Sequence, residues 1–168
     1  MNLKIRTILP LILSALAIMA VASAGFAAYE AYVRRQDAEA FLKINQISQR
    51  LLQSAGQWAV ERGMTNAPLK SPDALPAERR AEIVKIRTVA DQAFREAVQR
   101  LRSVPAMKSV EKQIAEAEGT FQTFESSRSR VDETLAKSGA GRTSEFVESF
   151  VPTITNLIEV AAVKLRVT

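Results

Sequence analysis

The chain has 168 residues, with 23 Lys or Arg and 18 Asp or Glu, and a formal net charge of +5. It contains no cysteine and no histidine, which excludes Cys/His zinc sites, histidine-ligated haem and nucleophilic catalysis by Cys or Ser-His. Positive and negative residues are intermixed, which argues against nucleic acid as a partner. We therefore expect no enzyme, no metal and no cofactor.

The amino-terminal end carries 23 consecutive uncharged residues, from Thr7 to Tyr29. A hydrocarbon core of roughly 30 Å needs about 20 helical residues, and in lipid only a helix satisfies its own backbone polar groups. The sequence therefore predicts a transmembrane helix over residues 7–29. Lys4 and Arg6 precede it, and basic flanks tend to stay in the cytoplasm. We expect residues 1–6 inside the cell and residues 30–168 outside the cytoplasm.

A cleaved secretory signal is the alternative to an anchor, because Ala22-Ser23-Ala24 fits a small-x-small cleavage site. Two features favour an uncleaved anchor. The apolar run is longer than the usual signal core of about 7 to 15 residues, and helix-compatible sequence continues through the cleavage site to Tyr32. Both alternatives place the same domain outside the cytoplasm.

Beyond the apolar run, glycine and proline are confined to a few places, so helix is the expected structure. The first helix is predicted to continue to about Arg62 and to end at Gly63, where a loop containing Pro68, Pro72 and Pro76 begins. The second helix is predicted over residues 77–103 and the third over residues 106–137, where Gly139-Ala140-Gly141 ends it. The last helix is predicted to run from Thr143 or Ser144 to the chain end.

Each predicted helix has one apolar stripe at helical spacing, which indicates an all-α fold and an antiparallel four-helix bundle. The third helix shows this best, with Val110, Ile114, Ala117, Phe121, Phe124, Val131 and Leu135 in one series. In this topology Thr168 would point towards the bilayer, where a second span is expected. We leave open whether the chain is part of a longer protein or the bundle has a single anchor.

Arg128 occupies the one position that interrupts the apolar series of the third helix. Arg87 joins the stripe of the second helix. At 1.5 Å per residue both lie roughly 14 Å below the loops farthest from the membrane, so they should share one layer. Trp58 and Arg62 of the first helix fall near that layer, as does Pro152, which removes a helix hydrogen bond.

Buried guanidinium groups cost several kcal/mol each unless they are paired. One interpretation is an internal ion-pair cluster with Glu61, Asp91 and Asp132, since each aspartate lies four residues after one of the arginines. The second is a small anionic ligand held by Arg62, Arg87 and Arg128 with Trp58 as a pocket wall; Trp58 is otherwise a core anchor. The third is a rotated helix that turns the arginines to solvent.

Three short elements carry a family resemblance, namely Glu61-Arg62-Gly63-Met64-Thr65-Asn66, the segment Arg87–Asp91 and the segment Arg128–Asp132. With them the chain resembles the extracytoplasmic helical sensor region of bacterial membrane signal transducers. These include methyl-accepting chemotaxis receptors, membrane-bound diguanylate cyclases and nitrate- and nitrite-sensing helical domains. The resemblance implies a periplasmic sensor of the inner membrane, usually a homodimer, that passes a displacement of its last helix to a cytoplasmic output module.

The resemblance also implies a second span and a methylation, cyclase or kinase module, and the residues up to Thr168 include none of these. Our leading hypothesis is a sensory module in which a ligand or partner shifts the last helix against the first. The alternative is a structural or adaptor bundle that docks another envelope protein.

Overall fold

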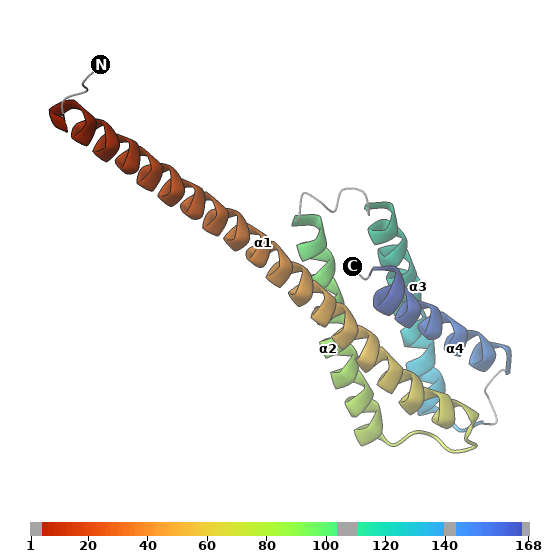
Figure 1. Cartoon of the computed structure of the whole chain (residues 1–168). Coiled ribbons are helices and arrows are strands. Elements are labelled where there is room, and N and C mark those ends of the chain that lie inside the picture. Colours follow the sequence, from red (N-terminus) through yellow and green to blue (C-terminus); the bar gives the residue numbers. More distant parts are fainter. Residues whose placement is uncertain (1–4, 104–110, 140–143, 166–168) are drawn as a thin grey trace. The chain divides into compact units, whose positions relative to one another are not determined.

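The computed structural model describes residues 5–103, 111–139 and 144–165, and within these ranges it is all-α, without a β-strand. The elements are α1 (Ile5–Lys70), α2 (Ala77–Ser103), α3 (Glu111–Ala136), α4 (Ser144–Glu159) and the π-helix η3 (Val160–Lys164). Figure 1 shows them in chain order. The predicted second helix is confirmed at both ends, and the third ends within one residue of its predicted end. Val110 and the predicted start of the third helix lie outside the described residues.

The chain forms two compact units, Met1–Lys43 and Ile44–Thr168, and α1 contributes to both. In the first unit the apolar side chains from Ile8 to Tyr29 are exposed. This stretch makes α1 long and apolar enough to cross a membrane. Farther along α1, Arg34 donates to Glu30 and Arg35 donates to Glu39, which are exposed pairs one helical turn apart.

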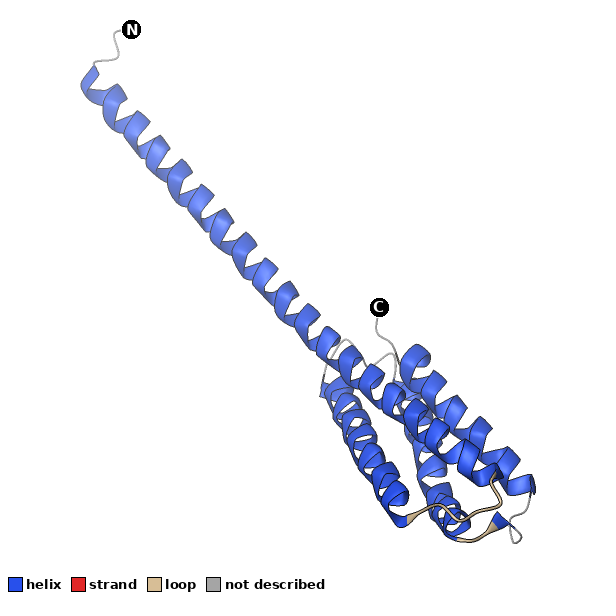
Figure 2. Cartoon of the chain, turned by 90° about the horizontal axis from the view of Figure 1, so that it is seen from below, coloured by secondary structure: helices blue, strands red, loops and turns tan. Residues whose placement is uncertain are grey.

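The second unit contains one hydrophobic core to which every helix contributes. In Figures 1 and 2, α2, α3 and α4 lie side by side with the last part of α1. The apolar stripes read from the sequence supply the core, because residues three and four apart share a helix face. The largest fully buried side chains are Trp58, Phe94, Phe124, Phe150, Ile47, Leu51, Ile83, Leu101, Ile114, Leu135, Ile154 and Leu157.

The end of α1 differs from the sequence prediction. The helix passes through Gly63 and Pro68 and ends at Lys70, so the loop covers only residues 71–76. Glycine costs a helix about 1 kcal/mol. Burial of Leu69 at the end of the same stripe offsets that cost, and the Thr65 hydroxyl donates to the Glu61 carbonyl oxygen. The prediction was wrong because it weighed local propensity without the tertiary contacts.

The loop before α2 packs against the end of α3 through backbone hydrogen bonds. The Leu75 amide donates to the Leu135 carbonyl oxygen at 2.8 Å, and the Gly139 amide donates to the Pro72 carbonyl oxygen at 2.7 Å. A Cβ at Gly139 would lie 2.9 Å from the Pro72 Cα. Glycine is therefore required at this position for close backbone approach.

The last helix was predicted as α-helix to the chain end, but it changes to a π-helix at Val160. The Leu165 amide donates to the carbonyl oxygen of Val160, five residues earlier. The wider turn keeps Leu157, Ala161 and Leu165, which are four residues apart, together in the core. The predicted cap at Thr143 lies outside the described residues.

Candidate functional site

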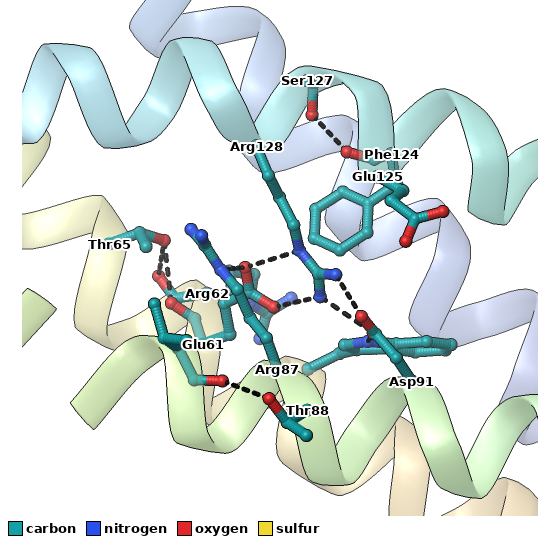
Figure 3. A network of polar contacts seen from close by, with 12 residues as sticks. Glu61, Arg62, Thr65, Arg87, Thr88, Asp91, Phe124, Glu125, Ser127 and Arg128 are labelled. Atoms are coloured by element: carbon teal, nitrogen blue, oxygen red, sulfur yellow. Dashed lines mark hydrogen bonds and ion pairs between the residues drawn. The ribbon is translucent and has the colours of Figure 1, made fainter. Parts of the chain in front are cut away.

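Glu61 is the centre of a buried polar network inside the second unit (Figure 3). It lies on α1 three residues after Trp58, on the face that packs into the core, and its exposure is 0%. One carboxylate oxygen accepts from Arg87 Nε at 2.6 Å, and the other accepts from Arg128 Nη2 at 2.7 Å. A single carboxylate therefore joins α1 to α2 and to α3.

Arg128 has all three of its guanidinium nitrogens engaged. Nε and Nη2 form a fork on Glu61, at 3.1 and 2.7 Å, while Nη1 and Nη2 form a second fork on Asp91, at 2.5 and 3.1 Å. The guanidinium carbon also lies 4.5 Å from the centre of the Phe124 ring. Such paired forks are the strongest arrangement that arginine makes with carboxylates, and the whole residue is only 7% exposed.

Arg87 is held less completely. Besides the bond from Nε to Glu61, Nη1 donates to both carboxylate oxygens of Asp132, at 2.8 and 2.7 Å. Nη2 is buried without a hydrogen-bond partner, although Arg87 as a whole is only 6% exposed. A buried donor without a partner is costly. Arg87 is therefore the member of the network with unused binding capacity.

The predicted shared layer of Arg87 and Arg128 is present, and the solvent-facing interpretation is wrong. Glu61, Asp91 and Asp132 are all partners, as the ion-pair interpretation expects, but the partners differ from the predicted ones. Arg87 pairs with Asp132, and Arg128 pairs with Asp91, so each bond crosses from α2 to α3. Arginine preceding the acid is the less favourable order for an i,i+4 pair, which favours the partner on the other helix.

Trp58 is fully buried beside this network. Its indole Nε1 donates to Asp91 Oδ1 at 3.1 Å, which satisfies the one polar atom of the side chain. Its ring packs against Phe94 and Phe121, with centroids 5.3 and 5.7 Å away. Trp58 is thus a core anchor that also orients Asp91 towards Arg128.

The network holds two positive and three negative groups, which gives it a net charge of −1. Burial by itself lowers the pKa of Arg128, but hydrogen bonds to Asp91 and Glu61 outweigh it and leave the pKa above its ordinary value. The pKa of Arg128 is thus higher in the folded protein than in the unfolded chain. The charge therefore contributes its full stabilisation at any pH below the pKa of the unfolded chain, and this contribution is lost only as the pH rises through the pKa of the folded protein. Arg128 is therefore charged throughout the physiological range.

Arg62 is the predicted ligand residue that the structure places outside this network. It is half-buried, and its Nη1 donates to the Thr155 hydroxyl of α4 at 3.1 Å. Pro152 lies inside α4, as predicted, but its side chain is exposed. Thr155 was missed because a threonine on the polar side of a helix has no distinguishing sequence signal.

A separate cleft of 390 Å³ lies between α2 and α3, lined by Phe94, Arg95, Val98, Gln99, Arg102, Glu118, Phe121, Gln122 and Glu125. It does not include Glu61, Arg87 or Arg128. Its arginines are already paired, with Arg95 on Glu125 and Arg102 on Glu118. Among the described residues no group of acidic side chains is arranged to hold a metal ion.

The model of the family described as nitrate and nitrite sensing matches residues 55–167 of the chain. The match covers more than half of the chain. It contains every residue of the network and agrees with the resemblance seen in the sequence. No curated protein and no solved structure matches the chain.

Proposed function

The chain belongs to the nitrate and nitrite sensing family, whose members are helical extracytoplasmic sensor domains of signal transducers, and from this membership we propose a chemoreceptor-like role in a bacterial inner membrane. In this proposal residues 1–6 are cytoplasmic, residues 7–29 span the membrane, and residues 30–168 form a periplasmic antiparallel four-helix bundle. Lys4 and Arg6 before the apolar run support this orientation. The working form would be a homodimer, as the resemblance implies.

The proposed ligand is a small anion of the nitrate and nitrite class, bound in the layer of Glu61, Arg87 and Arg128. The observation that carries this proposal is that two arginines from different helices meet in a buried layer. Burying ions is a poor means of stabilising a protein, because apolar side chains of similar volume often do as well or better. A function that needs guanidinium groups explains why they are there.

The signal would begin at this layer because the network ties three helices together. Glu61 lies on α1, Arg87 and Asp91 on α2, and Arg128 and Asp132 on α3. An anion that takes up some of these donors changes which helices are bonded to one another. Such an exchange can bias two packing states by a few kcal/mol. Because α4 packs against α3, we propose that a change in how α3 is held displaces α4 relative to α1.

Titration calorimetry on the full chain in detergent micelles tests this function. We expect nitrate or nitrite to bind in a saturable way, and Arg87→Lys to weaken binding at least tenfold because lysine lacks the planar fork. Arg95→Lys, an exposed arginine on the same helix, is the matched control and should bind as the wild type does. The proposal fails if a folded wild-type chain binds none of nitrate, nitrite or a carboxylate such as acetate. Capture of an envelope protein by that chain would then favour the adaptor function.

A further inference from the structure

Asp132 differs from the other carboxylates of the network in its exposure. Its side chain is 47% exposed, whereas that of Glu61 is 0% and that of Asp91 is 12%. It can therefore leave the network and be solvated by water with little rearrangement. We propose that Asp132 is an internal competitor that occupies the ligand position on Arg87 and is released when a monovalent oxyanion binds. This inference rests on the function proposed above.

The geometry of Arg87 shows what a ligand would gain. Both oxygens of Asp132 contact the same nitrogen, Nη1, at 2.8 and 2.7 Å, while Nη2 has no partner. A guanidinium group binds an oxyanion best through two parallel bonds, one from each of two nitrogens. A trigonal anion with two free oxygens can use Nη1 and Nη2 together. It would replace a one-nitrogen contact with a fork and satisfy the buried donor.

The charge of the network limits the kind of anion. With Asp132 bound, the five groups sum to −1. Release of Asp132 leaves two arginines balanced by Glu61 and Asp91, so a monovalent anion restores the original charge. A divalent anion such as sulfate would add a second, uncompensated negative charge to a buried layer, which is unfavourable. The exchange therefore selects monovalent anions.

The exchange also provides the structural signal. Arg87 lies on α2 and Asp132 on α3, so releasing Asp132 removes one of the two ion pairs that a buried arginine makes between these helices. The other pair, from Arg128 to Asp91, stays in place beside Trp58. Ligand binding would thus loosen α3 from α2 at the end of the network nearer the loop of residues 71–76. The contact between α2 and α3 beside Trp58 would stay unchanged.

Titration of the full chain in micelles with sodium nitrate and with sodium sulfate tests the competitor. We expect Asp132→Asn and Asp132→Ala to bind nitrate roughly threefold to tenfold more tightly than the wild type, because the competing half-exposed carboxylate is gone. Glu133→Gln and Glu133→Ala remove the same charge from the adjacent exposed position of α3 and should leave nitrate affinity unchanged. Sulfate should bind the wild type at least tenfold more weakly than nitrate.

The outcomes separate this inference from the proposed function. If the wild type binds nitrate and neither Asp132 variant binds it more tightly, the proposal that Asp132 competes with the anion is wrong, and the sensor function stands. The same holds if the Glu133 variants tighten binding as much, since the effect would then be one of general charge. If neither the wild type nor the Asp132 variants bind nitrate, the proposal that Asp132 competes with the anion is overturned, and the anion-sensing function is overturned as well if the wild type also binds neither nitrite nor acetate. Urea unfolding of each variant, followed by Trp58 fluorescence, verifies that the chain is folded.

Discussion

Two sets of ion pairs join α2 to α3, and they differ in the burial of their arginines rather than in distance. We call the set with buried arginines the buried set, although its Asp132 side chain is itself 47% exposed. In the buried set, Arg87 contacts Asp132 at 2.7 Å, and Arg128 contacts Asp91 at 2.5 Å. In the exposed set, Arg95 contacts Glu125 and Arg102 contacts Glu118, both at 2.7 Å. The arginine side chains of the first set are 8% exposed, and those of the second are 58% and 45% exposed.

The comparison shows that bond length alone does not identify an important ion pair. Exposed pairs are screened by water and typically contribute about 0 to 1 kcal/mol. Removing one partner of a buried pair is far more costly, about 3 to 5 kcal/mol, because a charge is left without compensation. The same type of substitution should therefore lower the free energy of unfolding more in the buried set than in the exposed set.

The largest effect is expected from Glu61→Gln. The substitution keeps the shape of the side chain but removes the charge that compensates two buried arginines, so we expect a loss of about 3 to 5 kcal/mol in the free energy of unfolding. Urea unfolding monitored by the single tryptophan, Trp58, measures it. Glu125→Gln in the exposed set is the control. Equal losses in the two variants would contradict the distinction between the sets.

A smaller effect is expected from Arg128→Lys, which keeps the charge and removes the fork. Lysine cannot make two bidentate contacts with Glu61 and Asp91 or stack on Phe124 in the same way, so we expect a loss of about 2 to 3 kcal/mol. Arg102→Lys should change the free energy of unfolding far less, because the pairs of Arg102 are screened by water. A comparable loss at position 102 would show that the fork is not what distinguishes Arg128.

Trp58→Phe should be milder still. It removes the indole donor to Asp91 and leaves a small cavity among Phe94 and Phe121, at an expected cost of about 1 to 2 kcal/mol. Because this variant has no tryptophan, its thermal unfolding is measured by circular dichroism against that of the wild type. An unchanged midpoint would show that the bond to Asp91 contributes nothing to the network.

The smallest effect is expected from Arg102→Ala, which removes the contacts with Glu118 and Glu111 at the surface. Because both pairs are screened by water, we expect a loss smaller than that of Trp58→Phe, and raising the salt concentration should reduce it further. Urea unfolding at low and high sodium chloride measures both quantities. A loss above that of Arg128→Lys would overturn the ranking.

The sequence was a good guide wherever helical periodicity decides the structure. It placed Arg87 and Arg128 in one layer because 1.5 Å per residue fixes their heights, and it named Glu61, Asp91 and Asp132 as partners. It paired each arginine with the aspartate four residues later on the same helix, which is wrong, because the pairing depends on how two helices face each other. Nor could it detect the unused Nη2 of Arg87, which is a property of the packed geometry alone.

The errors at the ends of helices have a similar cause. Gly63 and Pro68 are local signals for a helix end, but burial of Thr65 and Leu69 in the core outweighs them. The π-helix at Val160–Lys164 has no local signal, because the wider turn serves the packing of residues four apart. The membrane span, the bundle topology and the ligand residues stay predictions, with Arg62 now placed against Thr155 of α4.

The central claim is that Arg87 is the anion-binding group of the buried network. Nuclear magnetic resonance of the arginine side-chain N–H groups tests it most directly, on the full chain in micelles, with the Arg87 signal assigned by Arg87→Lys. We expect nitrate to shift the Arg87 signals in a saturable way and to leave those of Arg102 in place. Unchanged Arg87 signals at a nitrate concentration that saturates binding, or equal shifts at Arg102, would contradict it.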